Sequence, residues 1–270
     1  MKFTLLSAAL FSTLLFTGTA EAGTICTLVL DAKTGTTLMS DGDCKTRVTP
    51  ASTFKVPLAV IGFDSGFLKT PHEPLLDNKD PKASWGGAPE KVATDPTAWL
   101  KHSVIWYSQK ITHELGAGKL TRYGTELGLG NADFSGDKGK NNGLDRSWIG
   151  SSLKISPQEQ AAFTRKLVNG TLPVTPEAMT LTRQSVESSK VADGWTVHGK
   201  TGAAFPRLPD GSFDRAHGWG WFVGWATKGE RTIIFTRLVQ DEKAGQQSAG
   251  VRTKGDMLKN WPQFVAGFGG

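Results

Sequence analysis

Three Ser-x-x-Lys tetrapeptides occur in the sequence, and each would place a hydroxyl and an amine one turn apart on one face of a helix. A serine becomes an effective nucleophile when a neighbouring base takes its proton, so each pair is a candidate for serine chemistry. The copy at residues 135–138 lies in a stretch rich in Gly, Asp and Asn, and the copy at 151–154 precedes a helix that begins near Ser156. Neither copy is expected to be helical, which leaves Ser52 and Lys55.

Ser52 and Lys55 lie at the start of a predicted helix, because the mainly apolar run 56–61 follows them directly. The free N–H groups and the dipole of a helix N-terminus would help to stabilise an oxyanion at Ser52. Pro57 has no N–H to donate to the carbonyl four residues earlier, so the helix must begin close to Ser52 or bend there. The simpler interpretation of Ser52 is a helix cap, a position that serine favours.

A Lys-Thr-Gly tripeptide occurs twice. Residues 33–35 are best explained as the turn of a hairpin. Residues 200–202 end a predicted strand, where Lys200 and Thr201 would place a cation and a hydroxyl beside a cleft. Gly202 would let a substrate backbone approach closely. A solvated turn and a plain strand end are the simpler interpretations of the two copies.

The elements that must position these residues form three parts. Alternation in residues 24–30 and 36–40 predicts an N-terminal hairpin, and residues 50–190 have mainly helical patterning. Strand-like runs and a final helix follow, at residues 195–202, 219–227, 231–239 and about 248–266. The pattern predicts an α+β, two-lobe fold in which an antiparallel sheet built from both termini is flanked by helices and joined by a helical lobe. A cleft between the lobes is the expected place for a site.

The first residues are typical of a secretory leader, predicted over residues 1–22. Lys2 gives a positive start, residues 3–16 are mostly apolar, and residues 20–22 form an A-x-A cleavage site. The mature chain is therefore expected to be a single catalytic domain, residues 23–270. The apolar run is shorter than the ~20 residues of a membrane span, so no membrane anchor is expected after cleavage. The alternative is a retained N-terminal anchor.

Export places the two cysteines in an oxidising compartment. Folding the predicted hairpin about residue 34 puts Cys26 opposite Gly42, two positions from Cys44. A disulfide between Cys26 and Cys44 is therefore plausible and would be worth roughly 3 kcal/mol. The alternative is a pair of free, buried thiols.

Composition excludes several functional classes for this chain of 270 residues. The formal net charge is +6, but Lys and Arg are scattered rather than clustered on one tract, so no nucleic-acid partner is expected. Two cysteines are too few for a cysteine-rich zinc site, and the five histidines do not have the spacing of a metal motif. The sequence therefore predicts no metal site.

The order of the motifs along the chain is more specific than any single motif. Ser52-x-x-Lys55, then Ser103, then Lys200-Thr201-Gly202 is the succession found in penicillin-recognising serine enzymes. The sequence resembles the class D, or oxacillinase-type, serine β-lactamases over essentially the whole mature chain. Further matching segments are residues 50–55, Trp106, residues 130–133, Trp148 and residues 220–225.

Two departures from the family pattern concern the shape of the cleft. The family's Ser-x-Val is Ser103-Val104-Ile105 here, which keeps the hydroxyl and enlarges the apolar neighbour. Its Tyr-Gly-Asn is Leu129-Gly130-Asn131, which loses a phenol. Neither change removes a catalytic group, but both bear on substrate preference, and carbapenem turnover is left open.

The resemblance implies that Ser52 is acylated and that Lys55 is the base. Burial would depress the pKa of Lys55, and the neutral amine of class D enzymes adds CO2 to become N6-carboxylysine. Carbon dioxide or bicarbonate would therefore be needed, but no dissociable cofactor. Trp148 would donate its indole N–H to the carbamate. The simpler interpretations are a salt-bridged lysine and a core tryptophan. No Glu-x-x-Leu-Asn segment is present to supply the class A base instead.

The remaining implied roles concern the substrate. Ser103 would pass a proton to the departing β-lactam nitrogen, with an ordinary helix serine as the rival interpretation. The backbone N–H groups of Ser52 and Ala203 would form the oxyanion hole. The substrate-binding residues would be Lys200, Thr201, Gly202 and Arg252. Arg252 would bind the substrate carboxylate in bidentate geometry, unless it is only an exposed surface arginine.

These roles predict a periplasmic hydrolase that opens the β-lactam amide of penicillins and confers antibiotic resistance. Two alternatives share the motifs. One is a cell-wall transpeptidase or carboxypeptidase domain. The other is a β-lactam sensor that is acylated and stops. The sequence does not indicate an oligomeric state.

Overall fold

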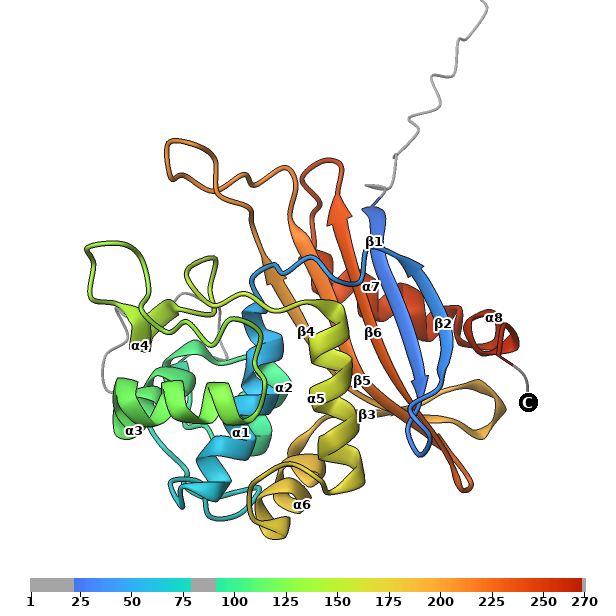
Figure 1. The fold of residues 1–270 in the computed structure, drawn as a ribbon, viewed down its shortest axis with the longest axis horizontal. Helices are drawn as coiled ribbons and strands as arrows, with labels where there is room; N and C mark the ends of the chain where they lie inside the picture. The colour runs from blue at the N-terminus through green and yellow to red at the C-terminus, as the bar shows by residue number, and fades with distance from the viewer. Residues whose placement is uncertain (1–21, 79–90, 269–270) are drawn as a thin grey trace, which may run out of the picture.

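The computed structural model describes residues 22–78 and 91–268 (Figure 1). One six-stranded sheet runs through the described residues, with the strand order β2-β1-β6-β5-β4-β3 and antiparallel pairing throughout. The strands are β1 (Ala22–Asp31), β2 (Thr37–Gly42), β3 (Ser188–Lys190), β4 (Thr196–Ala204), β5 (Trp219–Lys228) and β6 (Arg231–Asp241). Because β1 pairs with β6, the two ends of the chain build one sheet, as the sequence predicts.

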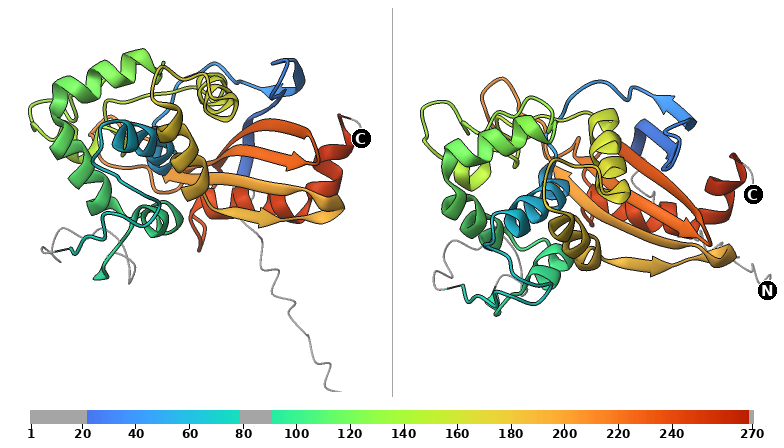
Figure 2. Two further views of the ribbon diagram at one scale, coloured as in Figure 1. Left: turned by 90° about the horizontal axis from the view of Figure 1, so that it is seen from below. Right: turned by 60° about the horizontal axis from the view of Figure 1, so that its bottom comes forward.

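Helices cover both faces of this sheet and form a second lobe beside it (Figures 1 and 2). The α-helices are α1 (Lys55–Asp64), α2 (Pro96–His102), α3 (Ile105–Glu126), α4 (Gly143–Arg146), α5 (Pro157–Asn169), α6 (Pro176–Ser185), α7 (Ala249–Lys259) and α8 (Trp261–Ala266). Two short 3-10 helices are η1 (Ala51–Phe54) and η4 (Ala192–Gly194). Helix α5 lies on one face of the sheet and α7 and α8 lie on the other (Figure 2).

The central strands β5 and β6 are buried on both faces, because successive side chains point to opposite sides and helices cover both. On β5, Trp225 packs into the core shared with the helical lobe. Phe222 packs into the core formed with Met257 of α7 and Trp261 of α8. This strand is rich in apolar residues because its side chains contribute to two separate cores.

The start of α5 confirms the signal at Ser156. The Ser156 hydroxyl accepts a hydrogen bond from the N–H of Glu159 at 3.2 Å, and the Glu159 carboxylate accepts one from the N–H of Ser156 at 2.9 Å. These reciprocal bonds satisfy two donors that a helix N-terminus leaves without partners. Gly170, at φ 69°, ends the helix in the left-handed conformation.

The N-terminal hairpin is confirmed with its expected register. Cys26 lies opposite Gly42, and residues 33–35 lie in the connecting turn. Cys26 and Cys44 form a disulfide, so the alternative of free thiols is wrong. The predicted leader lies outside the described residues, apart from Ala22, with which β1 begins.

The expected single helix over about 248–266 is wrong in one respect. The structure has two helices, α7 and α8, which meet at Asn260. Pro262 explains the break, because it has no N–H to continue the hydrogen bonds of α7 and fits the first turn of a new helix.

Across the described part of the chain, no helix combines the length and apolar character that a bilayer span requires.

Candidate active site

Ser52 and Lys55 lie where the sequence predicts, at the entry to a buried helix. Ser52 is in η1 and Lys55 is the first residue of α1. The Lys55 Nζ donates a hydrogen bond to the Ser52 Oγ at 3.3 Å. Pro57 falls in the first turn of α1, where backbone N–H groups lack partners within the helix. The conflict at Pro57 is therefore resolved by a 3-10 turn that precedes the α-helix.

The backbone next to Ser52 is held in an uncommon conformation. Ala51 has φ 50°, in the left-handed region that non-glycine residues rarely adopt. Its N–H donates to the carbonyl oxygen of Trp148 at 3.0 Å, which fixes this turn against another segment. Backbone strain of this kind persists where surrounding contacts impose it, and it is concentrated at functional sites.

Lys55 is fully buried. The adjacent Phe54 stacks on Trp148, with ring centroids 5.4 Å apart. The Trp148 indole is also fully buried, and its Nε1 has no hydrogen-bond partner among the described residues. A buried N–H without an acceptor costs about 1–3 kcal/mol, so the Trp148 indole could take an additional acceptor group.

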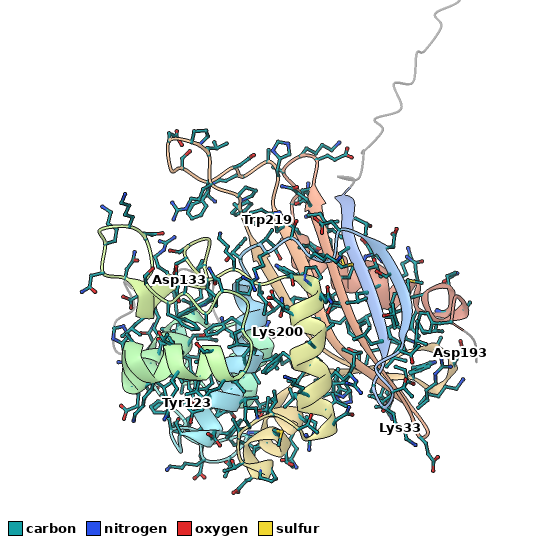
Figure 3. All side chains as sticks on the ribbon, viewed as in Figure 1. Lys33, Tyr123, Asp133, Asp193, Lys200 and Trp219 are labelled. Carbon is teal, nitrogen blue, oxygen red and sulfur yellow. A yellow bond between two sulfur atoms is a disulfide. The ribbon has the colours of Figure 1, made fainter. Side chains whose placement is uncertain are left out.

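Lys200 and Ser103 meet on the opposite side of the site, although 97 residues separate them. Lys200 is buried on β4 at the boundary between the sheet and the helical lobe (Figure 3). Its Nζ donates to the Ser103 Oγ at 2.5 Å and to the carbonyl oxygen of Thr201 at 3.2 Å. Burial, followed by the positive charge of Lys55, lowers the pKa of Lys200 to about 7. Lys200 can therefore gain or lose a proton near neutral pH.

Ser103 is not an ordinary helix serine. It ends α2 in the left-handed conformation, at φ 58°, and α3 begins two residues later at Ile105. This position lets the hydroxyl project from a turn toward Lys200 rather than from a helix face. The rival interpretation, an ordinary serine within a helix, is therefore wrong, because Ser103 does not have a helical conformation.

Gly202 allows a close approach, but the approaching backbone belongs to the protein itself. A Cβ at this position would lie 2.8 Å from the carbonyl oxygen of Pro50 and 3.1 Å from the Cγ2 of Thr53. Gly250 of α7 is equally tight, because its Cβ would lie 2.3 Å from the carbonyl oxygen of Gly202. Three backbones, those of η1, β4 and α7, therefore converge at Gly202.

The pairing of β4 with β5 also places Thr201 and Ala203. Thr201 lies opposite Phe222 and Ala203 opposite Gly220 in the β4–β5 ladder. Residues directly opposite each other share a face, so Thr201 lies on the face that carries α7. Ala203 is exposed, on the strand that η1 contacts. The placement of Ser52 on η1 and Ala203 on β4 fits a shared oxyanion hole, whose role stays a prediction.

Arg252 lies on α7 and is not a free surface arginine. Its guanidinium forms an ion pair with the buried carboxylate of Asp241 and donates to the carbonyl oxygen of Gln247. Sequence analysis did not single out Asp241 as the partner of Arg252. It lies beyond the predicted run 231–239 and is the last residue of β6, so no sequence pattern indicated it.

The other Ser-x-x-Lys copies are outside regular helices, as predicted. Residues 135–138 form a loop and residues 151–154 are irregular. The Ser151 hydroxyl donates its hydrogen bond to the Asp137 carboxylate and not to Lys154.

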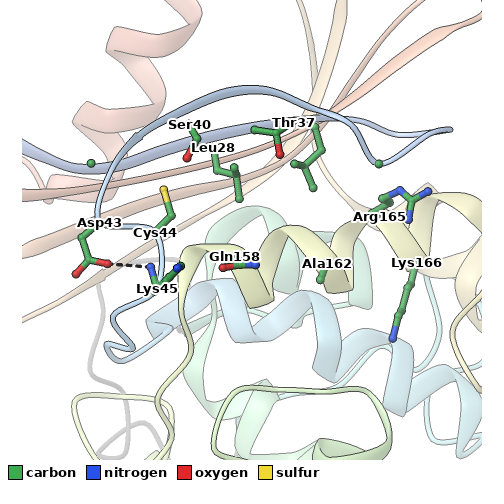
Figure 4. A pocket seen from close by; sticks show the side chains of 13 residues that line it. Leu28, Thr37, Ser40, Asp43, Cys44, Lys45, Gln158, Ala162, Arg165 and Lys166 are labelled. Carbon is green, nitrogen blue, oxygen red and sulfur yellow. Dashed lines mark hydrogen bonds between the residues drawn. The ribbon is translucent and has the colours of Figure 1, made fainter.

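A separate surface cavity of about 480 Å³ lies between the β1–β2 hairpin and α5 (Figure 4). Two hydrogen bonds join the hairpin segment to α5 on either side of this cavity. The Gln158 N–H donates to the Cys44 carbonyl oxygen, and the Arg165 Nε donates to the carbonyl oxygen of Ala32. No candidate catalytic residue lines this cavity. The described residues also contain no group of three or more His, Cys, Asp and Glu side chains that could hold a metal ion.

A serine one turn before a buried lysine, faced by a Lys-Thr-Gly strand, is the arrangement of penicillin-recognising serine enzymes. Residues 25–260 match the family model described as the penicillin binding protein transpeptidase domain. Two curated relatives and one solved structure narrow this class further.

β-Lactamase OXA-9 of Klebsiella pneumoniae is 39% identical over 243 residues, which cover 89% of this chain and 88% of the relative. β-Lactamase OXA-1 of Escherichia coli is 32% identical, over 85% of this chain and 80% of the relative. The crystal structure of the OXA-427 class D β-lactamase has a TM-score of 0.81 and 43% identity, covering 89% and 98% of the two chains. The chain belongs to the class D β-lactamases. Its predicted α+β fold and serine β-lactamase activity are thereby confirmed.

Proposed function

We propose that Ser52 opens the β-lactam amide of penicillins and that Lys55 acts as its base in the N6-carboxylated form. The observation that carries this proposal is the contact between the Nζ of Lys55, which is fully buried, and the Oγ of Ser52, which is half-buried. An ammonium has no lone pair to accept the serine proton, and complete burial of Lys55 disfavours the charged amine. A neutral amine can form an N–C bond with CO2 and release a proton, which leaves one negative charge on the lysine.

The pocket fits that group in two respects. The unpartnered Nε1 of Trp148 supplies a donor for an anion. The positive charge of Lys200 lies near enough to interact with Lys55, so a negative charge on Lys55 would replace repulsion with attraction. When bound, the carboxylate supplies the base that takes the proton of Ser52 and later that of water.

The residues of the chain then divide the acylation step among them. The Ser52 Oγ attacks the carbonyl carbon of the β-lactam, and the N–H groups of Ser52 and Ala203 hold the oxygen that becomes negative. Ser103 gives its proton to the ring nitrogen as the C–N bond breaks. Lys200, which donates a hydrogen bond to the Ser103 Oγ, returns a proton to Ser103 through that bond.

The side chains around Gly202 would orient the substrate. Lys200, Thr201 and Arg252 would hold the substrate carboxylate, with Thr201 and Arg252 associated with the same face of the sheet. Arg252 is already fixed by Asp241, so its guanidinium loses little conformational freedom when it binds.

The setting we propose is the periplasm, reached through the leader at residues 1–22, where hydrolysis would protect the cell from penicillins. The disulfide between Cys26 and Cys44 supports an oxidising compartment.

Intact-mass measurement after addition of benzylpenicillin tests this proposal. A rapid return to the free mass indicates hydrolysis, whereas a persistent adduct indicates a sensor or a transpeptidase. Lys55→Ala is expected to acquire the adduct slowly and to release it hardly at all. Normal hydrolysis by Lys55→Ala would show that the base is misassigned.

A further inference from the structure

Trp148 lies on a segment that has no regular secondary structure, so its position depends on individual contacts. Toward η1, its carbonyl oxygen accepts bonds from the Ala51 N–H at 3.0 Å and the Thr49 hydroxyl at 2.8 Å. The Gly150 N–H donates to the same Thr49 hydroxyl at 3.0 Å. These bonds fix the side of the segment that faces Ser52.

The other side of the segment is held by Arg207, which comes from the loop between β4 and β5. This loop and the loop around α4 lie at the same end of the molecule (Figure 1). The Arg207 Nε donates to the Gly150 carbonyl oxygen at 3.0 Å, and the Nη2 donates to the Asp137 Oδ1 at 3.1 Å. The Nη1 donates to the Gly211 carbonyl oxygen at 2.6 Å. One planar guanidinium thus joins three segments with a fixed geometry.

An aromatic ring reinforces this junction. Phe213, on the same loop as Arg207, lies with its ring centroid 4.1 Å from the Arg207 guanidinium carbon. The ring also packs on Gly150, where a Cβ would lie 2.7 Å from the Phe213 Cε1. Such stacking holds the guanidinium plane and favours glycine at position 150.

Asp137 is charged and shared among several donors. Although burial opposes ionisation, hydrogen bonds from Ser151 and Asn142 and the charges of Arg146 and Arg207 lower the pKa of Asp137 below its usual value. Arg146, two residues before Trp148, approaches the Asp137 carboxylate at 3.2 Å. Asp137 therefore binds residues on both sides of Trp148.

We propose that Asp137 and Arg207 are positioning residues that hold the Trp148 indole in its place on Phe54, the residue next to Lys55. This inference rests on the proposed function, because it assigns the two residues a role in retaining CO2 on Lys55. The β4–β5 loop thereby controls the base without touching it, since Gly150 lies only two residues from Trp148. Loosening the junction would let the indole N–H move away and would weaken retention of the carboxyl group.

The test is the bicarbonate requirement of Arg207→Ala. Each enzyme is treated at acid pH in CO2-depleted buffer and returned to neutral pH at increasing bicarbonate. Loss of the charged bonds at Gly150 and Asp137 should raise the half-maximal bicarbonate concentration by about tenfold. Saturating bicarbonate should restore kcat, and KM should change little. The carbamate signal in 13C NMR with labelled bicarbonate should decline in parallel, which gives a readout independent of turnover.

Arg215→Ala is the matched control. Arg215 lies on the same loop, and its guanidinium carbon lies 5.5 Å from the centroid of the Phe205 ring. In the described residues it makes no contact with Gly150 or Asp137. It should keep the normal bicarbonate requirement. Asp137→Asn keeps the side-chain volume and should shift the requirement in the same direction, which covers the case in which Arg207→Ala does not fold. A normal requirement in a folded Arg207 or Asp137 variant overturns the inference, as does a loss of kcat that bicarbonate does not restore. Failure of the unaltered enzyme to respond to bicarbonate would instead overturn the proposed base.

Discussion

Trp148→Phe should weaken the retention of CO2 on Lys55 while leaving the fold intact. Phenylalanine keeps the aromatic stack on Phe54 and removes the indole N–H, which has no other acceptor among the described residues. A hydrogen bond to a charged group contributes about 1.5–3 kcal/mol, which corresponds to about a 10- to 150-fold change in affinity for CO2. The bicarbonate concentration that gives half-maximal recovery after acid treatment should rise by that factor.

Trp106→Phe is a stringent control for this prediction. Trp106 is also buried, and its Nε1 also has no partner in the described part of the chain. It packs on Tyr107 rather than on Phe54, so removing its N–H leaves the stack of Trp148 on Phe54 intact. Both substitutions remove similar volume from the core, and their unfolding free energies should decrease similarly. If Trp148→Phe recovers at the normal bicarbonate concentration, or Trp106→Phe shifts it equally, the indole of Trp148 does not hold the carboxyl group.

Three further predictions concern charge and cross-linking. In CO2-depleted buffer the unfolding free energy should rise from about pH 7 to 10, because Lys200 has a pKa of about 7 when folded and near 10.5 when unfolded. Lys200→Met should abolish that rise in denaturant titrations, and an unchanged slope would contradict the assignment. Asp241→Asn should raise KM for benzylpenicillin by about tenfold with little change in kcat, because it frees the Arg252 guanidinium. An unchanged KM, together with a raised KM in Arg252→Ala, would show that Asp241 does not position the arginine. Replacing Cys26 and Cys44 with serine should lower the unfolding free energy by about 3 kcal/mol in urea titrations, and a change below 1 kcal/mol would refute the chain-entropy estimate.

Features set by local spacing could be predicted from the sequence. The hairpin register that brings Cys26 near Cys44 follows from two alternating runs and a turn. The contact between Ser52 and Lys55 follows from helical periodicity, and the start of α5 follows from its capping residues. In each case the interacting groups lie within about one turn of helix or across one hairpin, so local backbone geometry determines their distance.

Contacts between distant segments could not be predicted, because they depend on how the lobes pack. The bond from Lys200 to Ser103 spans 97 residues, and the bond from Arg207 to Asp137 spans 70. The sequence contains many arginines and aspartates, and nothing in their spacing selects this pair. Resemblance to a family identified Ser103 and Lys200 by their motifs, but it gave no signal for Asp137, Arg207 or Asp241.

The location of the site follows from the unequal lengths of two neighbouring strands. Strand β3 pairs with β4 only at Thr196–His198, so in the described structure no strand covers the outer edge of β4 beyond Gly199. An uncovered edge offers backbone N–H and C=O groups to another chain or a ligand. Here η1 and α7 pack closely on β4 because positions 202 and 250 are glycine. Gly202→Ala would push η1 away from β4 and separate Ser52 from Ala203, which should reduce acylation of Ser52 more than binding of benzylpenicillin. Burst-phase kinetics measure the two separately, and an equal acylation rate in Gly202→Ala would show that this close packing does not set the geometry of the oxyanion hole.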